Sequence, residues 1–406
     1  MNILFLNNGR FAPVNSHTMY SDLMREFYNK GHNVYVVSAN ERRNKAVEEY
    51  YDDSGIHVVC IRIGNLTKCS LIEKTLTTTT IADKYIKAIR KYYSEVKFDL
   101  VIYPTPPITL TKAVEFVKSR DGAITYLLLK DIFPQNAIDI GLMSKDGIKG
   151  IIYRYFRKIE KKLYSISDCI GCMSSANVNY ILKNNVISES KVEICPNCIA
   201  IRDKSVDKQT RDSIRKKYGL PFNKTILVYG GNLGKPQGIP FIIDCIRRCI
   251  DLDNIFFLIV GSGSEYGKME EFFLMDKPHN AKLMSSLPKE DYDSMVGACD
   301  VGLIFLDNRF TIPNFPSRLL AYLQAKLPVL AATDANTDLG KTILEGKFGW
   351  WCESVDVSQF YDLVNKIEKN DLKDYGNRGY EYLCSHYSVE YAYSIINESI
   401  GRLLRK

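Results

Sequence analysis

The sequence lacks the long apolar run, roughly 18 residues, that a membrane-spanning helix needs. It also begins without an export signal, because MNILFLNNGR has no basic first segment and no small-residue cleavage site. This opening stretch has the pattern of a short first strand that ends at Asn and Gly. We therefore expect a cytoplasmic protein.

A nucleic-acid-binding motif is also missing, although the net charge is +7. Residues 1–200 contain 27 Lys and Arg against 20 Asp and Glu, so the first half of the chain carries the whole excess. We therefore expect no nucleic-acid partner. The asymmetry favours an anionic partner for the first half, either a membrane surface or an anionic substrate.

The eleven cysteines form no convincing metal-binding cluster. Two Cys-x-x-Cys pairs, Cys169 with Cys172 and Cys195 with Cys198, have the spacing of a zinc ribbon. However, the first pair lies in an apolar run, DCIGCM, that is typical of a buried strand, where positions i and i+3 face opposite sides. We therefore expect reduced thiols in the core and no metal.

What the sequence does contain is a repeated alternation of strand-like and helix-like segments. Its 406 residues suit two α/β domains of about 200 residues each. A polar stretch that ends at Asp212 is typical of a linker between them. In the first half we expect strands at Asn2–Leu6, His32–Ser38, Ile56–Ile63, Phe98–Tyr103 and Ile124–Leu129, and a charged loop at Glu41–Ser54. In the second half we expect strands near 225–229, 255–260, 281–284, 300–305 and 328–332, and helices from Tyr361 to Leu404.

The stretch Thr225–Pro240 has the order strand, Gly-rich turn, helix. The strand is expected to break at Gly230-Gly231, where two glycines let the backbone approach a ligand closely. The helix behind them offers unpaired N–H groups. Lys235 adds a cation, and Asn232 and Gln237 add neutral donors, which suits a diphosphate. Taken alone, such a turn is more often plain turn chemistry than a ligand site.

Other loops follow the expected strands of the second half in the same way. One is the run Gly261-Ser262-Gly263, and another is FTIPNFPSR, which ends at Arg318 and opens a helix. The segment MSSLP, which contains Ser286 and Leu287, could offer backbone groups to a base. Glu265 is either part of this site or only an exposed residue at a helix start. Because the carboxyl ends of parallel strands meet at one sheet edge, these loops together predict a nucleotide site.

The stretch Gly147–Tyr164 is a basic, aromatic helix. An ordinary solvated helix face would explain it. The alternative is a helix that lies on anionic lipid headgroups. The cations that would contact the membrane are Arg154, Arg157, Lys158, Lys161 and Lys162.

The order of GGNLGKPQG, VGSGSE, SSLP, CDVGLIFL and PSRLLAYLQAKLPVLAA resembles the C-terminal half of glycosyltransferase family 4. The motifs GRF…SHTMYSDLMREFYNKGHNVYVVS and ICPN are similar to that family too, so the resemblance covers nearly the whole chain. More narrowly, NNGR…ERRN, YLLLKDIFPQNA, IGCMSSANV, YGGNLGKPQG and IPNFPSRLLAYLQAK resemble bacterial N-acetyl-L-fucosaminyl transferases of O-antigen and capsule synthesis.

The resemblance implies an α/β protein of the GT-B architecture, in which two Rossmann-like domains face a cleft. The N-terminal domain, residues 1–198, would bind the acceptor. Residues 199–385 would bind the nucleotide sugar. A C-terminal helix in residues 386–406 would pack back on the N-terminal domain.

The same resemblance implies that the Gly-rich turn holds the donor diphosphate. Many members have Arg and Lys where this chain has Asn232 and Gln237, so Lys235 would supply the charge. The family's two glutamates are absent, because their positions hold Pro313 and Ala321, and this leaves the ribose contacts open. The donor-binding set is Gly230, Gly231, Asn232, Lys235, Gln237, Gly261, Gly263, Ser286, Leu287, Asn314, Phe315, Pro316, Ser317 and Arg318.

Asp131 is the candidate catalytic residue, because it follows a buried strand of the first half and a transferase benefits from a carboxylate near the acceptor hydroxyl. An N-capping role before FPQNA is the alternative. Asn8, Gly9 and Arg10 follow the first strand and are expected to line the acceptor site. His17 would either join them or cap the first helix.

Together these features predict a metal-independent, cofactor-free transferase on the inner face of the cytoplasmic membrane. The donor would be a UDP-sugar, and the resemblance implies UDP-N-acetyl-L-fucosamine. The acceptor would be a polyprenyl-diphosphate-linked saccharide. Two alternatives remain open: a sugar-nucleotide 2-epimerase with the same architecture, and a non-catalytic partner subunit that has lost the glutamate pair.

Overall fold

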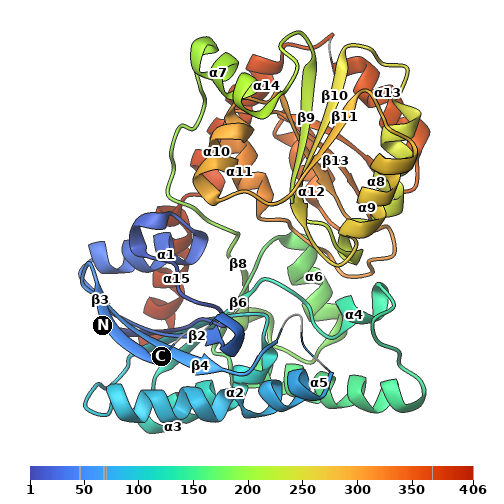
Figure 1. Ribbon diagram of the computed structural model, residues 1–406. Helices are drawn as coiled ribbons and strands as arrows, with labels where there is room; N and C mark the ends of the chain where they lie inside the picture. The colour runs from blue at the N-terminus through green and yellow to red at the C-terminus, as the bar shows by residue number, and fades with distance from the viewer. Residues whose placement is uncertain (45–46, 67–68, 70, 368, 406) are drawn as a thin grey trace. The chain divides into compact units, whose positions relative to one another are not determined.

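The computed structural model describes residues 1–44, 47–66, 69, 71–367 and 369–405, and it divides into two compact units (Figure 1). Unit 1 is Met1–Ala200 together with Ser388–Lys406, and unit 2 is Ile201–Tyr387. These boundaries differ by two residues from the domains that the sequence predicts. The last helix, α15 (Val389–Leu404), packs against α1 (Met19–Asn29) within unit 1.

Unit 1 contains an eight-stranded sheet in the order β3-β4-β2-β1-β5-β6-β7-β8. All neighbouring strands are parallel except β3 and β4. The central strands are continuous apolar runs because helices cover both faces of the sheet. The strands are β1 (Asn2–Leu6), β2 (Asn33–Glu41), β3 (Glu49–Asp53), β4 (Ile56–Ile63), β5 (Leu100–Pro104), β6 (Ile124–Leu129), β7 (Cys169–Cys172) and β8 (Val192–Ile194).

The charged loop expected at Glu41–Ser54 is wrong at both of its ends. β2 extends to Glu41, and Glu49–Asp53 forms the edge strand β3, while residues 45–46 lie outside the described part. Most of β3 is exposed, so its residues carry no alternating apolar pattern. A sequence pattern that depends on burial therefore gives no signal for it.

The helices of unit 1 form a layer on each face of the sheet. The cluster of α1, α15 and the sheet buries Phe5, Phe27 and Ile396. On the other side α3 contacts both α2 and α5, as Figure 1 shows. The helices not yet given are α2 (Leu71–Tyr92), α3 (Thr111–Asp121), α4 (Gln135–Asp139), α5 (Gly147–Ile166) and α6 (Ser175–Asn184). Within the described residues, no helix combines the length and apolar character that crossing a membrane requires.

Unit 2 contains a six-stranded parallel sheet in the order β11-β10-β9-β12-β13-β14. Its edge strand β14, the five-residue run GWWCE, was not among the expected strands. The strands are β9 (Thr225–Asn232), β10 (Ile255–Ser262), β11 (Ala281–Met284), β12 (Val301–Phe305), β13 (Val329–Thr333) and β14 (Gly349–Glu353).

Helices α8, α9 and α13 pack on one face of this sheet around Phe257, Phe305 and Phe360. The predicted linker to Asp212 is too long, because α7 begins at Lys208, where the Asp207 side chain accepts a hydrogen bond from Thr210 N. The helices are α7 (Lys208–Tyr218), α8 (Ile239–Arg248), α9 (Tyr266–Met275), α10 (Lys289–Gly297), α11 (Arg318–Gln324), α12 (Leu339–Glu345), α13 (Val357–Ile367) and α14 (Leu372–His386).

The predicted break of the strand at Gly230-Gly231 is also wrong. β9 continues through both glycines to Asn232 and pairs with β10 as far as Ser262. A Cβ on Gly261 would lie 1.9 Å from Gly231 O, so this close pairing depends on the absence of a side chain. The turn therefore begins at Leu233 and contains a short 3-10 helix, Lys235–Gln237, before α8.

Candidate functional site

The strand order of unit 2 reverses direction between β9 and β12, the point at which parallel α/β sheets bind ligands. The two strands pair only through Leu227 with Val301 and Val228 with Gly302. Beyond these pairs they diverge toward their carboxyl ends. The candidate site is built around this divergence.

Tyr322 of α11 fills the gap between the two strands. Its hydroxyl accepts a hydrogen bond from Gly230 N at 3.3 Å and lies 3.1 Å from Val228 O and 3.0 Å from Leu303 O. Gly302 leaves room for the ring, because a Cβ there would lie 2.3 Å from it. Burial raises the pKa of Tyr322 to about 12, so the hydroxyl stays protonated and donates to one of the two carbonyls.

Arg318, the first residue of α11, places a cation beside this bridge. Its guanidinium lies over the ring of Tyr229 at 4.4 Å from the centroid. Its Nη2 is 3.6 Å from the position that a Cβ on Gly231 would take. Its buried Nη1 has no hydrogen-bond partner, and no described carboxylate forms an ion pair with it. A half-buried guanidinium that has a buried, vacant N–H donor and no counter-ion among the described residues is a ready site for an anion.

Of the residues predicted to bind the donor from the loop before α11, some have available side-chain donors and others do not. Asn314 Nδ2 is buried without a hydrogen-bond partner, while its backbone oxygen accepts from Thr337 Oγ1 at 2.5 Å. Phe315 is buried and its ring lies 6.1 Å from that of Tyr387, so it belongs to the core. Pro316 is half-buried and Ser317 is exposed. Asn314 and Arg318 therefore offer side-chain donors.

The neutral donors of the Gly-rich turn form hydrogen bonds within the turn itself. Asn232 Nδ2 donates to Gln237 Oε1 at 3.0 Å, and Gly234 N donates to the same oxygen at 3.2 Å. Tyr229 donates its hydroxyl proton to Asn232 O at 2.6 Å. These bonds give Asn232 and Gln237 a role in fixing the shape of the turn.

The two glycines of β9 differ in what they face. A Cβ on Gly230 would lie 1.8 Å from the Tyr292 hydroxyl, so this glycine makes room for a tyrosine rather than a ligand. Gly231 has a φ of 124°, a conformation that favours glycine, and only Arg318 approaches it within 4 Å. Close approach of a ligand is thus restricted to Gly231, which corrects the expectation for the pair.

The other predicted donor-site positions serve the packing of the strands or lie in a loop. A Cβ on Gly261 would meet Gly231 O, and one on Gly263 would lie 2.3 Å from Leu233 O. Ser286 is exposed and Leu287 half-buried in the segment after β11. Their contact with a base stays a prediction.

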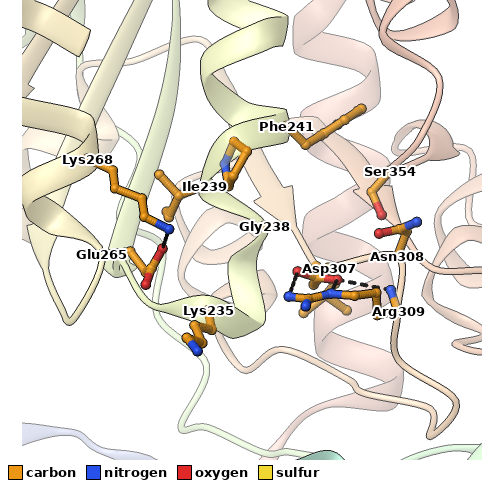
Figure 2. A pocket seen from close by; sticks show the side chains of 12 residues that line it. Lys235, Gly238, Ile239, Phe241, Glu265, Lys268, Asp307, Asn308, Arg309 and Ser354 are labelled. Atoms are coloured by element: carbon orange, nitrogen blue, oxygen red, sulfur yellow. Dashed lines mark hydrogen bonds and ion pairs between the residues drawn. The ribbon is translucent and has the colours of Figure 1, made fainter. Parts of the chain in front are cut away.

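A pocket of about 440 Å³ lies beside the Gly-rich turn, as Figure 2 shows. Its charges are largely paired: Glu265 with Lys268, and Asp307 with Arg309 at 2.7 Å. Lys235 lines the same pocket without an ion-pair partner among the described residues. Lys235 is therefore the cation of the turn that could bind an anionic ligand, whereas Glu265 forms an ion pair with Lys268.

Asp131 lies directly after β6 in unit 1. Both of its carboxylate oxygens accept hydrogen bonds from Asn136 Nδ2, at 2.7 and 2.8 Å. Thr105 Oγ1 fixes the backbone by donating to Asp131 O at 3.0 Å. Burial raises the pKa of Asp131 to about 6. The capping alternative is wrong, because α4 begins at Gln135 with Pro134 at the cap and no side-chain cap bond.

The residues after β1 have local partners in unit 1. Gly9 O accepts from Ala39 N at 3.2 Å, and Asn8 Oδ1 is buried without a hydrogen-bond partner. Arg10 is exposed and forms a 3.5 Å ion pair with Glu49 of β3. Contact of these three residues with an acceptor stays a prediction.

His17 does not cap the first helix. Thr18 occupies the N-cap of α1 and accepts a hydrogen bond from Ser21 N, which corrects the capping alternative. The Nδ1 atom of His17 instead lies 3.1 Å from Asp22 Oδ1 and 3.0 Å from Arg25 Nη2. These contacts hold the imidazole within unit 1.

The cysteines of both Cys-x-x-Cys pairs are buried. Burial raises the pKa of Cys172 and of Cys198 to about 12, so these thiols stay protonated at neutral pH. In the described ranges, no three His, Cys, Asp or Glu residues gather in a way that could hold a metal ion.

The five basic residues of α5 that the sequence analysis expects at a membrane divide into two groups. Arg157 binds Glu160 at 2.6 Å and Asn185 Oδ1 at 2.7 Å, and Lys162 binds Glu115 at 2.6 Å. The other three are exposed and form no ion pair within the described part of the chain. They are Arg154, Lys158 and Lys161.

The sequence analysis missed the three tyrosines that surround Arg318. Tyr229 directly precedes Gly230 in the sequence, and its place at the end of the expected strand 225–229 was a signal that could have marked it. Tyr292 and Tyr322 lie on α10 and α11 and gave no such signal, because their approach to Gly230 depends on the folded sheet.

Comparisons with known proteins find a family model that matches part of the chain and two curated relatives. Residues 210–382 match the model described as glycosyl transferases group 1. The chain is 23% identical over 336 residues, 81% of its length and 80% of the relative's, to the probable glycosyltransferase WbjE of Pseudomonas aeruginosa. It is 25% identical over 249 residues, 60% of each protein, to the putative colanic acid biosynthesis glycosyl transferase WcaI of Escherichia coli (strain K12).

The solved structure of Anabaena HepE in complex with UDP shares the fold. Its TM-score is 0.68 at 13% identity, with 99% of this chain and 100% of that chain covered. The two parallel sheets described above are thus the arrangement known as GT-B.

Proposed function

We propose that this chain is a glycosyltransferase of the GT-B fold that transfers N-acetyl-L-fucosamine from a UDP-sugar to a polyprenyl-diphosphate-linked saccharide. The pathway is the synthesis of a bacterial polysaccharide, which is consistent with the colanic acid role in the description of WcaI. The choice of sugar rests on the motif resemblance of YLLLKDIFPQNA and IPNFPSRLLAYLQAK to fucosaminyl transferases.

The single observation that carries the donor proposal is the half-buried guanidinium of Arg318, whose buried Nη1 has no hydrogen-bond partner. It lies at the switch point of the sheet without a carboxylate partner, next to the open face of Gly231. A diphosphate bound there would supply the missing counter-charge and use the vacant Nη1 donor. UDP is the proposed nucleotide, a choice that the complex of HepE with UDP supports.

The same cation offers a metal-independent route for the leaving group. In sugar transfer, negative charge develops on the diphosphate as its bond to the anomeric carbon breaks. Arg318 and Lys235 would stabilise that charge, which is how fixed positive groups lower a barrier in a pre-organised site. We therefore propose that the reaction needs no divalent cation.

Asp131 is the proposed base for the acceptor hydroxyl. A carboxyl group with a pKa of about 6 is mostly ionised at neutral pH, yet it is more basic than an ordinary aspartate. Asn136 holds both oxygens in place. Asn8, Gly9, Arg10 and His17 remain the proposed acceptor contacts.

The proposed acceptor carries a polyprenyl chain, so the enzyme must work at a membrane surface. Arg154, Lys158 and Lys161 are exposed and free of ion pairs within the described residues, which supports contact with anionic headgroups. Arg157 and Lys162 are proposed to contribute less, because Glu160 and Glu115 neutralise them.

The direct test is transfer of label from a panel of UDP-amino sugars to a polyprenyl-diphosphate-linked saccharide, with EDTA present. Transfer from UDP-N-acetyl-L-fucosamine supports the proposal. Transfer from another UDP-sugar keeps the enzyme and overturns the sugar. Conversion of the donor to a 2-epimer would favour the epimerase, and a complete lack of transfer and hydrolysis would favour the non-catalytic subunit.

A further inference from the structure

Helix α5 and the loop before it expose an unusual number of large apolar side chains. Soluble monomers seldom leave such side chains together in water, so an exposed cluster marks an interaction surface. The exposed fractions are 54% for Leu142, 80% for Ile148, 60% for Ile151, 45% for Ile152 and 52% for Tyr155.

Four of these residues share one side of α5. Ile148, Ile151, Ile152 and Tyr155 follow the spacing i, i+3, i+4, i+7, which places them on a single helical face. We name these four residues the apolar α5 face. The buried residues of α5 are Gly150, Glu160, Leu163 and Tyr164, whereas every residue of the apolar α5 face is exposed, so this face is turned toward solvent.

The charges around the apolar α5 face are almost all positive. Lys149, Arg154, Lys158 and Lys161 are exposed, and none of them forms an ion pair with a described residue. Asp146 is the single exposed carboxylate between Gly141 and Lys162. A second copy of the chain docked symmetrically would bring these cations together. An anionic lipid surface matches both the charge and the apolar side chains.

We propose that the apolar α5 face inserts between the lipids of an anionic bilayer while the flanking cations contact phosphate headgroups. This proposal differs from a purely electrostatic contact, because apolar side chains in the first turns of α5 would enter the bilayer. It rests on the proposed function only in that a lipid-linked acceptor requires the surface. Vesicle binding can be measured without any sugar, so the two proposals can fail separately.

The first experiment is flotation of the full chain with vesicles of phosphatidylglycerol and phosphatidylcholine, compared with phosphatidylcholine alone. We expect binding to the anionic vesicles and a loss of at least about tenfold in partitioning for Ile148→Ser/Ile151→Ser. The matched control is Leu274→Ser/Met275→Ser on α9, which changes two exposed apolar residues of unit 2 and should bind like the wild type.

A second variant separates insertion from adsorption. Trp fluorescence of Ile151→Trp should be quenched by brominated acyl chains, whereas the wild-type tryptophans, Trp350 and Trp351 of unit 2, should not be. Lys158→Gln/Lys161→Gln should weaken binding and reduce its salt dependence. Because all these side chains are exposed, unchanged thermal unfolding of each variant serves as the folding control.

Three results would overturn the proposal. One is wild-type binding that survives Ile148→Ser/Ile151→Ser, and another is equal binding to both vesicle types. The third is a dimer in solution that ignores vesicles and dissociates in the Ile148→Ser/Ile151→Ser variant, since it would make the apolar α5 face an interface between copies.

Discussion

The guanidinium of Arg318 lies 4.4 Å from the ring centre of Tyr229, and this ring takes the place that a carboxylate would take in an ordinary buried ion pair. A carboxylate would neutralise the charge, whereas an aromatic face holds a cation and leaves its charge available. The positions where the resemblance to the family implies two glutamates hold Pro313 and Ala321, so this chain has no acidic group there.

Tyr229 is expected to act through the position of Arg318. Tyr229→Leu removes the ring and should weaken UDP binding about tenfold, the amount that one desolvated cation–π contact is worth. Tyr229→Phe keeps the ring and loses only the bond to Asn232 O, so its affinity should change by less than about threefold. Isothermal titration with UDP measures both, and equal affinities for the two variants would contradict the role.

Lys235 and Lys268 line the same pocket and form a matched pair. Lys235→Gln removes a cation without an ion-pair partner and should weaken UDP binding by about tenfold. Lys268→Gln removes a cation that Glu265 already neutralises, so little change is expected. Titration at low and moderate salt should show the difference, and a larger effect for Lys268 would reverse the assignment.

Gly230 and Tyr292 are expected to be coupled. Gly230→Ala would place a Cβ 1.8 Å from the Tyr292 hydroxyl and should lower the free energy of unfolding by about 1–3 kcal/mol. In a Tyr292→Ala background the same change should cost clearly less. Denaturant unfolding of the four proteins gives the coupling energy. Additive effects would mean that the two side chains do not meet.

The raised pKa of Asp131 predicts that transferase activity depends on pH. Its pKa of about 6 in the folded protein means that activity should fall as the pH drops through about 6, because the base becomes protonated. Asn136→Ala removes the donor to the carboxylate and should move this acid limb to higher pH. Asp139→Asn, on the same short helix, should leave the limb in place. A flat profile of wild-type activity from about pH 5 to 8 would contradict the assignment.

The ionisation of Asp131 should change the free energy of unfolding with pH in the opposite direction to that of a salt-bridged aspartate. Burial raises the pKa of Asp131 above its unfolded value of 3.8, so the folded state favours the protonated carboxyl. This group contributes stability below about pH 3.8, and that contribution is lost as the pH rises through about 6. Asp131→Asn should therefore abolish transfer and yet raise the melting temperature at neutral pH.

The central strands were predictable because burial on both faces leaves continuous apolar runs such as FFLIV and YLLL in the chain. The edge strands β3 and β14 were not, since an edge strand needs no such run. The Gly-rich loops pointed to the candidate site because glycine lets the backbone approach a ligand or another strand closely. Which glycine faces a ligand depended on Tyr292 and Tyr322, which reach Gly230 from other elements of the fold.

The charged residues show a similar limit. The sequence located the basic residues of α5, but ion pairs with Glu115 and Glu160 connect segments whose approach no local pattern reveals. The apolar α5 face was hidden for a related reason. From the sequence alone, an apolar residue on a helix is assigned to the core. Only the structure shows which side of the helix packs against the rest of the protein.

The most direct test of the account is the thermal shift of the wild type and of Arg318→Gln with UDP, GDP, ADP and CDP, each with EDTA or with magnesium. The account predicts a rise in melting temperature with UDP that exceeds the other three, is the same in EDTA and disappears in Arg318→Gln, while Arg309→Gln, whose cation is paired with Asp307, keeps it. A UDP shift that requires magnesium, or one that survives Arg318→Gln, would contradict the account.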